Sequence, residues 1–287
     1  MKHTIRAALF GGAIWCAGQA PAGDTYTIFG PSSTAAGSNY YNWDSYNATN
    51  YLNDLRNALH GTYHFANAFA TFDAKTRAYS FDYLGCCNVI QRADCIISPW
   101  WDESYQTAYE VYVASYHFLA NGKDLLLFND DSGHDGIAAY LGVPTFSSGA
   151  GSTWTGSGFP FDGPFGNAAG VTAYGTIGYL DASDVLSTGG QILATDSSGR
   201  PTIAFWDDDE YAPGAGRMLI VTDVNTVTSG FGNAQFFPPN NQGRFALNLI
   251  AGLIGGEGCN KADCDQNGIL NFDDIDCFVD GFLGGCP

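Results

Sequence analysis

The chain is poor in basic residues and in charged residues of either sign. Of its 287 residues, 11 are Lys or Arg and 29 are Asp or Glu, which gives a formal net charge of −18. A surface of this sign repels phosphate groups, so a main function in binding nucleic acid or an anionic membrane is excluded. Hydrophobic residues make up 45% of the chain, which suffices for one sizeable core and a small appendage.

Long apolar runs are missing beyond the N-terminus, and the run at residues 245–256 has only the length of a core helix. We therefore expect no membrane span in the mature chain. At the N-terminus, Lys2 and Arg6 precede an uncharged stretch, and small residues follow at Ala20 and Ala22. This order is typical of a signal peptide over residues 1–22 and predicts a secreted or cell-surface protein.

Cysteine is used unevenly, and Cys16 lies within the predicted signal peptide. An exported chain meets an oxidising compartment, which favours disulfides. The four C-terminal cysteines can form two bridges with three alternative pairings, while the earlier three can form one bridge and leave one thiol. In the earlier group, Cys95 is expected to pair with one of its two neighbours. The two groups are Cys86, Cys87 and Cys95, and Cys259, Cys264, Cys277 and Cys286.

The stretch "DCDQNGILNFDD" carries oxygen-bearing side chains at alternate positions around Gly268. A twelve-residue calcium loop of the EF-hand type needs this order of ligands, with glycine at the sixth position for the sharp turn. An acidic turn without an ion is the alternative. The sequence predicts a Ca²⁺ site made by Asp263, Asp265, Asn267, the backbone carbonyl of Ile269, Asn271 and Asp274.

Apolar residues at helical spacing follow this loop, at Ile275, Phe278, Val279 and Phe282. The closing ligand Asp274 is one methylene shorter than the usual Glu, and the loop holds three carboxylates in all. Both features predict an affinity in the range of about 0.1–1 mM that is typical of extracellular modules.

The loop, its helix and their C-terminal place on an exported chain resemble a dockerin module. Dockerins anchor enzymes or surface proteins to cohesin-type partners and normally carry two such repeats, whereas one repeat is visible here, over residues 263–283. The resemblance implies calcium binding and anchoring to a cohesin-like or other cell-surface protein. We expect three parts in the chain: a signal peptide (1–22), a large domain (23–256) and a calcium-binding module (257–287).

The large domain alternates apolar strand patterns with amphipathic helix patterns, which predicts an α/β fold with a doubly wound, mostly parallel sheet. A Gly-rich segment from Thr145 to Thr188 is expected to be an irregular insertion or lid. Strands are expected within 25–31, 93–101, 123–131, 191–205 (as a hairpin turning at Ser198 and Gly199) and 216–229. Helices are expected within 48–61, 104–122, 135–143 and 243–255.

Three motifs of this domain resemble the class I glutamine-amidotransferase-like superfamily, and in particular its exported members that are not amidotransferases. They are "LANGKDLLLF" before two acids, "GRMLIVTD" and "RFALNLIAGL". The resemblance implies a flavodoxin-like core. It does not imply the activity, because the nucleophile turn Gly-x-Cys-x-Gly of that family is absent, and the chain has "FNDDSGHDG" in its place.

Several side chains of the domain are candidates for a site. Ser132 and His134 could form a catalytic pair beyond a strand end, although Asp131 or Ser132 could equally cap the next helix. The acidic run "WDDDEY" (206–211) could bind a second calcium ion or be a solvated loop. Trp100, Trp101 and the aromatic residues within 39–47 could stack on sugar rings or pack in the core.

We therefore expect a secreted or surface-anchored protein with a non-catalytic α/β domain carried on a calcium-binding, dockerin-like anchoring module. One alternative is an exported hydrolase, acting on polysaccharide for example, that the same tail docks to a surface. Another is a carbohydrate-binding module that uses the aromatic residues. Two carboxyls with raised pKa in one place would favour hydrolysis, and a row of exposed aromatic rings would favour sugar binding.

Overall fold

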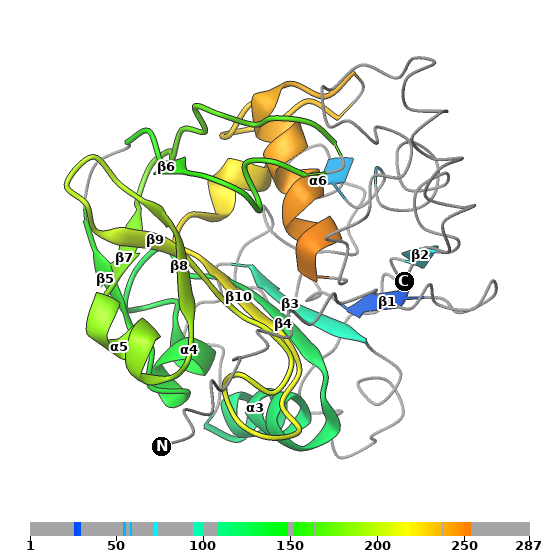
Figure 1. Ribbon diagram of the computed structural model, residues 1–287, viewed down its shortest axis with the longest axis vertical. Helices are drawn as coiled ribbons and strands as arrows, with labels where there is room; N and C mark the ends of the chain where they lie inside the picture. The colour runs from blue at the N-terminus through cyan, green and yellow to red at the C-terminus, as the bar shows by residue number, and fades with distance from the viewer. Residues whose placement is uncertain are drawn as a thin grey trace, which may run out of the picture. The chain divides into compact units, whose positions relative to one another are not determined.

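Five parallel strands form one half of an eight-stranded sheet (Figure 1). Their order is β2-β1-β3-β4-β10, and every neighbouring pair in it is parallel. Counted along the chain this is the order 2-1-3-4-5, which is the order of flavodoxin-like sheets. The strands are β1 (Tyr26–Phe29), β2 (Phe72–Asp73), β3 (Cys95–Pro99), β4 (Asp124–Phe128) and β10 (Met218–Val221).

The structure is a computed structural model that describes residues 26–29, 54, 55, 58, 72–73, 94–99, 108–148, 152–163, 165–236 and 238–253. All of them belong to one compact unit, Ala20–Gly258. The predicted signal peptide, the calcium loop, the sugar-stacking aromatic residues and every cysteine except Cys95 lie outside the described residues. The predictions made for them stay predictions.

The other half of the sheet is antiparallel and consists of β9 (Pro201–Trp206), β8 (Gln191–Thr195) and the short β6 (Thr155–Gly156). β8 and β9 form the predicted hairpin, and Gly199 has the positive φ of 77° that this turn requires. The expected parallel sheet is therefore confirmed, but it is extended by an antiparallel half.

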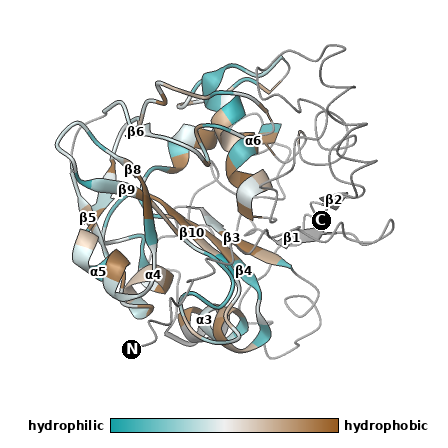
Figure 2. Cartoon of the chain, viewed as in Figure 1, coloured by the Kyte–Doolittle hydropathy of each residue, from teal (hydrophilic) through white to brown (hydrophobic). Residues whose placement is uncertain are grey.

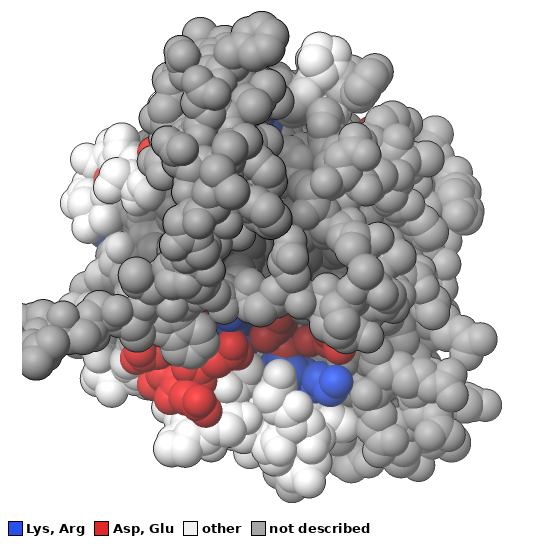
Figure 3. Space-filling model, turned by 45° about the vertical axis from the view of Figure 1, so that its right-hand side comes forward, with Lys and Arg blue, Asp and Glu red and all other residues white. Residues whose placement is uncertain are grey.

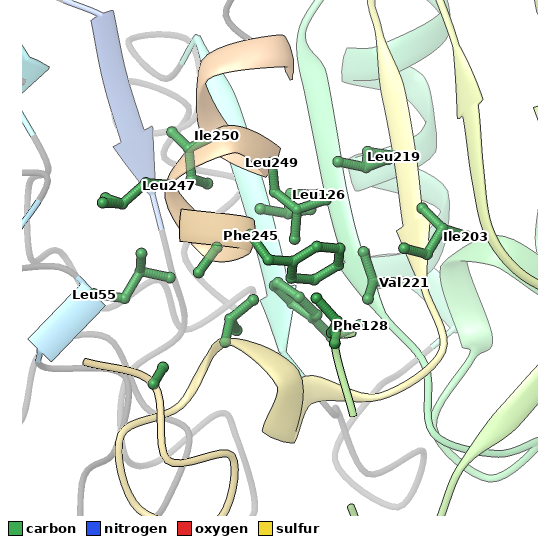
Figure 4. Close-up of a cluster of buried hydrophobic side chains, with 14 of the residues drawn as sticks. Leu55, Leu126, Phe128, Ile203, Leu219, Val221, Phe245, Leu247, Leu249 and Ile250 are labelled. Carbon is green, nitrogen blue, oxygen red and sulfur yellow. The ribbon is translucent and has the colours of Figure 1, made fainter. Parts of the chain in front are cut away.

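Helices cover both faces of the sheet, as a doubly wound fold requires. One face packs against α6 (Asn241–Leu253), and the other packs against α3 (Ala108–Asn121), α4 (Gly136–Tyr140) and α5 (Ala182–Ser187). Alternate residues of the buried strand β4 serve the two faces. Figure 4 shows Leu126 and Phe128 near Phe245 of α6, whereas Leu125 and Leu127 belong to the cluster on the α3 side.

Burial on both faces explains the hydrophobic run in β4, because neither face meets water. Figure 2 shows the same concentration of hydrophobic residues along the central strands. Among the described residues, no helix combines the length and the hydrophobicity needed to cross a membrane.

The Gly-rich segment from Thr145 to Thr188 contains regular structure, so the expectation of an irregular insertion is wrong in part. β5 (Thr145–Ser147) pairs with β7 (Gly178–Leu180) in a separate antiparallel sheet, and α5 follows it. Asp181 caps α5 by accepting the Ser183 N–H at 2.7 Å. Elements of two to six residues are too short to show a periodicity in the sequence, which is why the pattern missed them.

Candidate functional site

The candidate site lies where β4 and β10 end side by side. These neighbouring strands are parallel, so their carboxyl ends lie at the same edge of the sheet. Asn129, Asp130 and Asp131 follow β4, and Thr222 and Asp223 follow β10. Open α/β sheets bind their ligands beyond this carboxyl edge, so the acidic residues stand at the usual place for chemistry.

Two buried carboxyls hold one turn at this edge. Asp130 is 3% exposed, and its Oδ1 accepts the Val224 N–H at 2.8 Å. Asp223 is fully buried and caps the 3₁₀ helix η4 (Val224–Val227), since its Oδ1 accepts the Asn225 N–H at 2.8 Å. The other oxygen of Asp223, Oδ2, accepts the Tyr174 N–H at 2.6 Å. Both acids thus act on the backbone of residues 223–225.

These two carboxyls also favour the protonated state. Burial, and then the nearby charge of Asp223, raise the pKa of Asp130 well above its usual range. Burial raises the pKa of Asp223 to about 8, although hydrogen bonds from the backbone of Tyr174 and Asn225 oppose this change. Neither carboxyl has a basic partner within the described residues. The pair, which titrates as a unit, therefore keeps at least one proton at neutral pH.

A third acid at the same edge orients a histidine. Oδ1 of Asp131 lies 2.6 Å from Nδ1 of His134 and also accepts the Gly133 N–H at 2.8 Å. Both side chains are partly exposed. An imidazole whose Nδ1 is held by a carboxylate has its Nε2 fixed in direction, which is the arrangement of a general base.

This contact corrects two sequence-based expectations. The partner of His134 is Asp131 rather than Ser132, which is exposed. Neither Asp131 nor Ser132 caps the following helix, because the N-cap of α4 is Asp135. Its side chain makes no capping bond and instead accepts the Thr145 N–H at 2.5 Å through Oδ2. The three-residue spacing across Gly133 could have indicated the Asp–His contact.

A stretch that we call the covering segment, residues 171–178, closes over the same edge. Its Gly178 N–H donates to the Thr222 carbonyl at 2.9 Å, and the Asn225 side-chain amide donates to the Tyr174 carbonyl at 3.0 Å. A side chain at position 178 would meet Thr145 and come within 2.8 Å of the Asn129 carbonyl oxygen. Only glycine allows so close an approach at this point.

Two carboxylates of the acidic run 206–211 form ion pairs with Arg217. Nε of Arg217 lies 2.9 Å from Oδ1 of Asp207, and its Nη2 lies 3.2 Å from Oδ2 of Asp208. Nη1 of Arg217 also donates to the carbonyl of Leu253, the last residue of α6, at 3.1 Å. Figure 3 shows acidic side chains gathered with basic ones on one face. These carboxylates form a salt bridge at the end of α6, and the described residues contain no cluster suited to a metal ion.

Two further expectations, the pairing of Cys95 and the exposure of aromatic side chains, involve residues of which the structure describes only some. Cys95 is buried at the start of β3, but Cys86 and Cys87 lie outside the described residues, so the pairing stays a prediction. Exposed aromatic side chains do occur, and one of them, Phe146, stacks on Tyr179 with a distance of 5.5 Å between ring centroids. The guanidinium of Arg200 covers the Tyr179 ring at 4.4 Å, so this ring is held inside a stack.

Comparisons with known proteins find similarity to solved structures. No protein-family model matches the chain, and no curated protein matches it significantly. A solved structure described as a putative ThuA-like protein from Bacteroides uniformis is similar, with 14% sequence identity and a TM-score of 0.43. The match covers 80% of this chain and 90% of that one. Likeness at this level says nothing about activity, and the fold class follows from the sheet itself.

Proposed function

We propose that this chain is a secreted or surface-anchored protein whose α/β domain is not catalytic and is carried on a calcium-binding, dockerin-like anchoring module. Support for export comes from the basic, apolar and small-residue order of residues 1–22. Support for anchoring comes from the calcium-loop pattern between Asp263 and Asp274. A cohesin-like or other cell-surface protein is the proposed partner.

The non-catalytic part of the proposal is supported by the burial of Asp130 and by its hydrogen bond to the backbone. Asp130 lies just after β4, where the superfamily that the motifs of this domain resemble has its nucleophile. Its carboxyl, however, is buried and accepts a backbone N–H. A group in this position holds the β10–η4 turn and offers substrate no reactive atom. We expect no release of ammonia from glutamine. Ammonia release that disappears when Cys86, Cys87 or Cys95 is replaced would contradict this.

The calcium part is tested by melting the full mature chain with and without calcium. Calcium binds the folded loop and not the unfolded chain, so millimolar calcium should raise the melting temperature of the tail. Magnesium should substitute poorly, because it demands a tighter octahedral site and keeps its water. Asp263→Ala should abolish the shift.

The matched control is Asp207→Ala, which removes a carboxylate from the acidic run that is bound to Arg217. This variant should keep the calcium response. If several millimolar calcium shifts no transition in the unaltered chain, or if both variants lose the response equally, the run at residues 263–274 is only an acidic turn.

A second candidate function, an exported hydrolase, is favoured by two observations at this edge. One is the Asp131–His134 contact of 2.6 Å, and the other is the raised pKa of both Asp130 and Asp223. A carboxylate-oriented imidazole beside a buried acid pair is able to move protons. Turnover of p-nitrophenyl esters and soluble polysaccharides separates the two candidates. A hydrolase would lose its activity in His134→Gln, lose part of it in Asp131→Asn, and keep it in Ser132→Ala. A non-catalytic domain would show no turnover that depends on His134.

A further inference from the structure

The covering segment is attached to the carboxyl edge of the sheet through an acidic joint. Of the hydrogen bonds that join Tyr174 to this edge, one ends on the Asp223 carboxylate and one comes from Asn225, whose own N–H is held by Asp223. Asp130 accepts the N–H of Val224, the residue between Asp223 and Asn225. The position of Tyr174 therefore depends on two carboxyls that act on one turn, whereas Thr172 of the same segment is held by the Gln242 side chain of α6.

Among the described residues, the surroundings of this joint supply negative charge and no compensating cation. Asp131 adds to the unfavourable field at Asp130, and it is itself engaged by His134. Asp135, the remaining acid of the β4–α4 connection, is turned to Thr145. Tyr174 contributes its backbone to the joint. Within the described residues, no lysine or arginine contacts either carboxyl.

We propose that the Asp130–Asp223 pair is a pH-sensitive latch, which holds the covering segment at Tyr174 against the carboxyl edge of the sheet while it retains a proton and releases this part of the segment as both carboxyls ionise. Two adjacent buried carboxylates repel each other strongly, because burial weakens the screening of their charges. Releasing this part of the segment admits water to both groups and so relieves the repulsion.

The direction of the effect follows from proton binding in the closed and open states. An exposed Asp ionises near its ordinary pKa of about 4, whereas Asp223 in the closed joint has a pKa of about 8. The closed state therefore binds more protons between these values, and rising pH favours the open state throughout this range. The closed state is favoured most at and below about pH 4, and its advantage falls as pH rises until Asp223 and Asp130 have both ionised.

Amide hydrogen exchange of the full chain tests the latch, with rates corrected for the intrinsic effect of pH. The reporters are the N–H groups of Tyr174, Val224 and Asn225, which donate to the two acids. We expect their protection to fall between about pH 5 and about pH 8, by up to about tenfold per pH unit for each proton released. The internal control is the Phe165 N–H, which a neutral side chain, Asn248, holds in the same inserted segment.

The matched variant is Asp130→Asn, which keeps an oxygen acceptor for Val224 and removes one charge. Its reporters should lose most of their pH dependence, while Asp181→Asn, a change at the exposed cap of α5, should leave that dependence intact. The latch is refuted if the three reporters keep constant protection across the range, if Phe165 loses protection in parallel, or if Asp130→Asn responds like the unaltered chain. The comparison of the reporters with Phe165 decides the matter even if the variant fails to fold.

Discussion

Two of the attachments between the domain and the inserted segment between β5 and β7 use different chemistry. At α6, the fully buried Asn248 donates to the carbonyls of Pro160 and Gly166 at 3.2 and 3.0 Å and accepts the Phe165 N–H at 3.0 Å. At the sheet edge, Asp223 accepts the Tyr174 N–H at 2.6 Å. An amide both donates and accepts without charge, whereas a carboxylate only accepts.

The difference explains why only one attachment is sensitive to protons. Asn248 satisfies a donor and two acceptors of the backbone, so its site needs no counter-charge. Among the described residues, the hydrogen-bond partners of Asp130 and Asp223 are N–H donors and no cation contacts either carboxyl. The cost of burying two charges is therefore avoided by keeping a proton. Similar backbone contacts are thus made at both attachments, but only those of the acid pair respond to pH.

The largest effect is expected from Asn248→Ala. The variant leaves buried backbone groups of the inserted segment without partners and opens a cavity beside Gly163, which lies against this side chain. Three lost hydrogen bonds correspond to a loss of about 3 kcal/mol in the free energy of unfolding. Urea denaturation should give the same loss at about pH 5 and at about pH 8.

Asn241→Ala is the matched control for this prediction. Its amide donates to the Ala169 carbonyl at 2.8 Å in an exposed position, so the expected loss is under about 1 kcal/mol. A loss for Asn248→Ala that differs strongly between the two pH values would mean that the amide attachment is also coupled to protons.

A smaller effect, which depends on pH, is expected from the acid pair. Since the folded state holds protons that the unfolded chain releases near pH 4, the free energy of unfolding should fall as pH rises toward about 8. The slope is at most about 1.4 kcal/mol per pH unit for each proton. Asp130→Asn should flatten this slope and be the more stable protein at about pH 8.

Asp223→Asn provides the contrast, because Asp223 uses both oxygens as acceptors. The amide group of the variant must face either the Tyr174 or the Asn225 N–H, so stability should be lost at every pH. Equal behaviour of the two variants in urea denaturation would contradict the assigned hydrogen bonds.

The smallest effect is expected at Asp196, where the sign is reversed. Burial raises the pKa of this carboxyl, but hydrogen bonds from the Arg200 side chain and from the backbone outweigh burial and leave the pKa below its usual value. Its contribution is therefore present above about pH 4 and is lost in stronger acid. Asp196→Asn should cost under about 1 kcal/mol at neutral pH and nothing in acid, as urea titrations at both values would show.

The parts of the fold that could be predicted from the sequence are those whose residues carry a local pattern. The buried strand Asp124–Phe128 reads as a continuous apolar run, and the hairpin around Gly199 is announced by its turn residues. The two residues of β2 and the short strands β5, β6 and β7 carry no such pattern. They exist because neighbouring backbone pairs with them.

The candidate site shows the same limit. The cluster around Asp130 was identified from its position after a strand, but the pairing within it was not. Asp130 and the Val224 N–H that it accepts are 94 residues apart, so no spacing relates them. Asp131 and His134 are only three residues apart, yet the alternatives that the sequence offers for this loop are a Ser132–His134 pair and a helix cap, and neither includes their contact. In both cases the hydrogen-bond partner is set by contact in the folded chain and not by residue type.

Carboxyl ¹³C NMR of the full chain, with Asp130→Asn used to assign the signals, is the decisive measurement on the sheet edge. If the edge is held by a proton-bearing acid pair, the signals of Asp130 and Asp223 should change together as pH is raised. They should also show that the pair still holds a proton at pH 7. Their titration should extend to pH 8 or above. If both carboxyls are fully ionised by about pH 5, as ordinary Asp residues are, the acid pair holds no proton and the proposed latch is wrong.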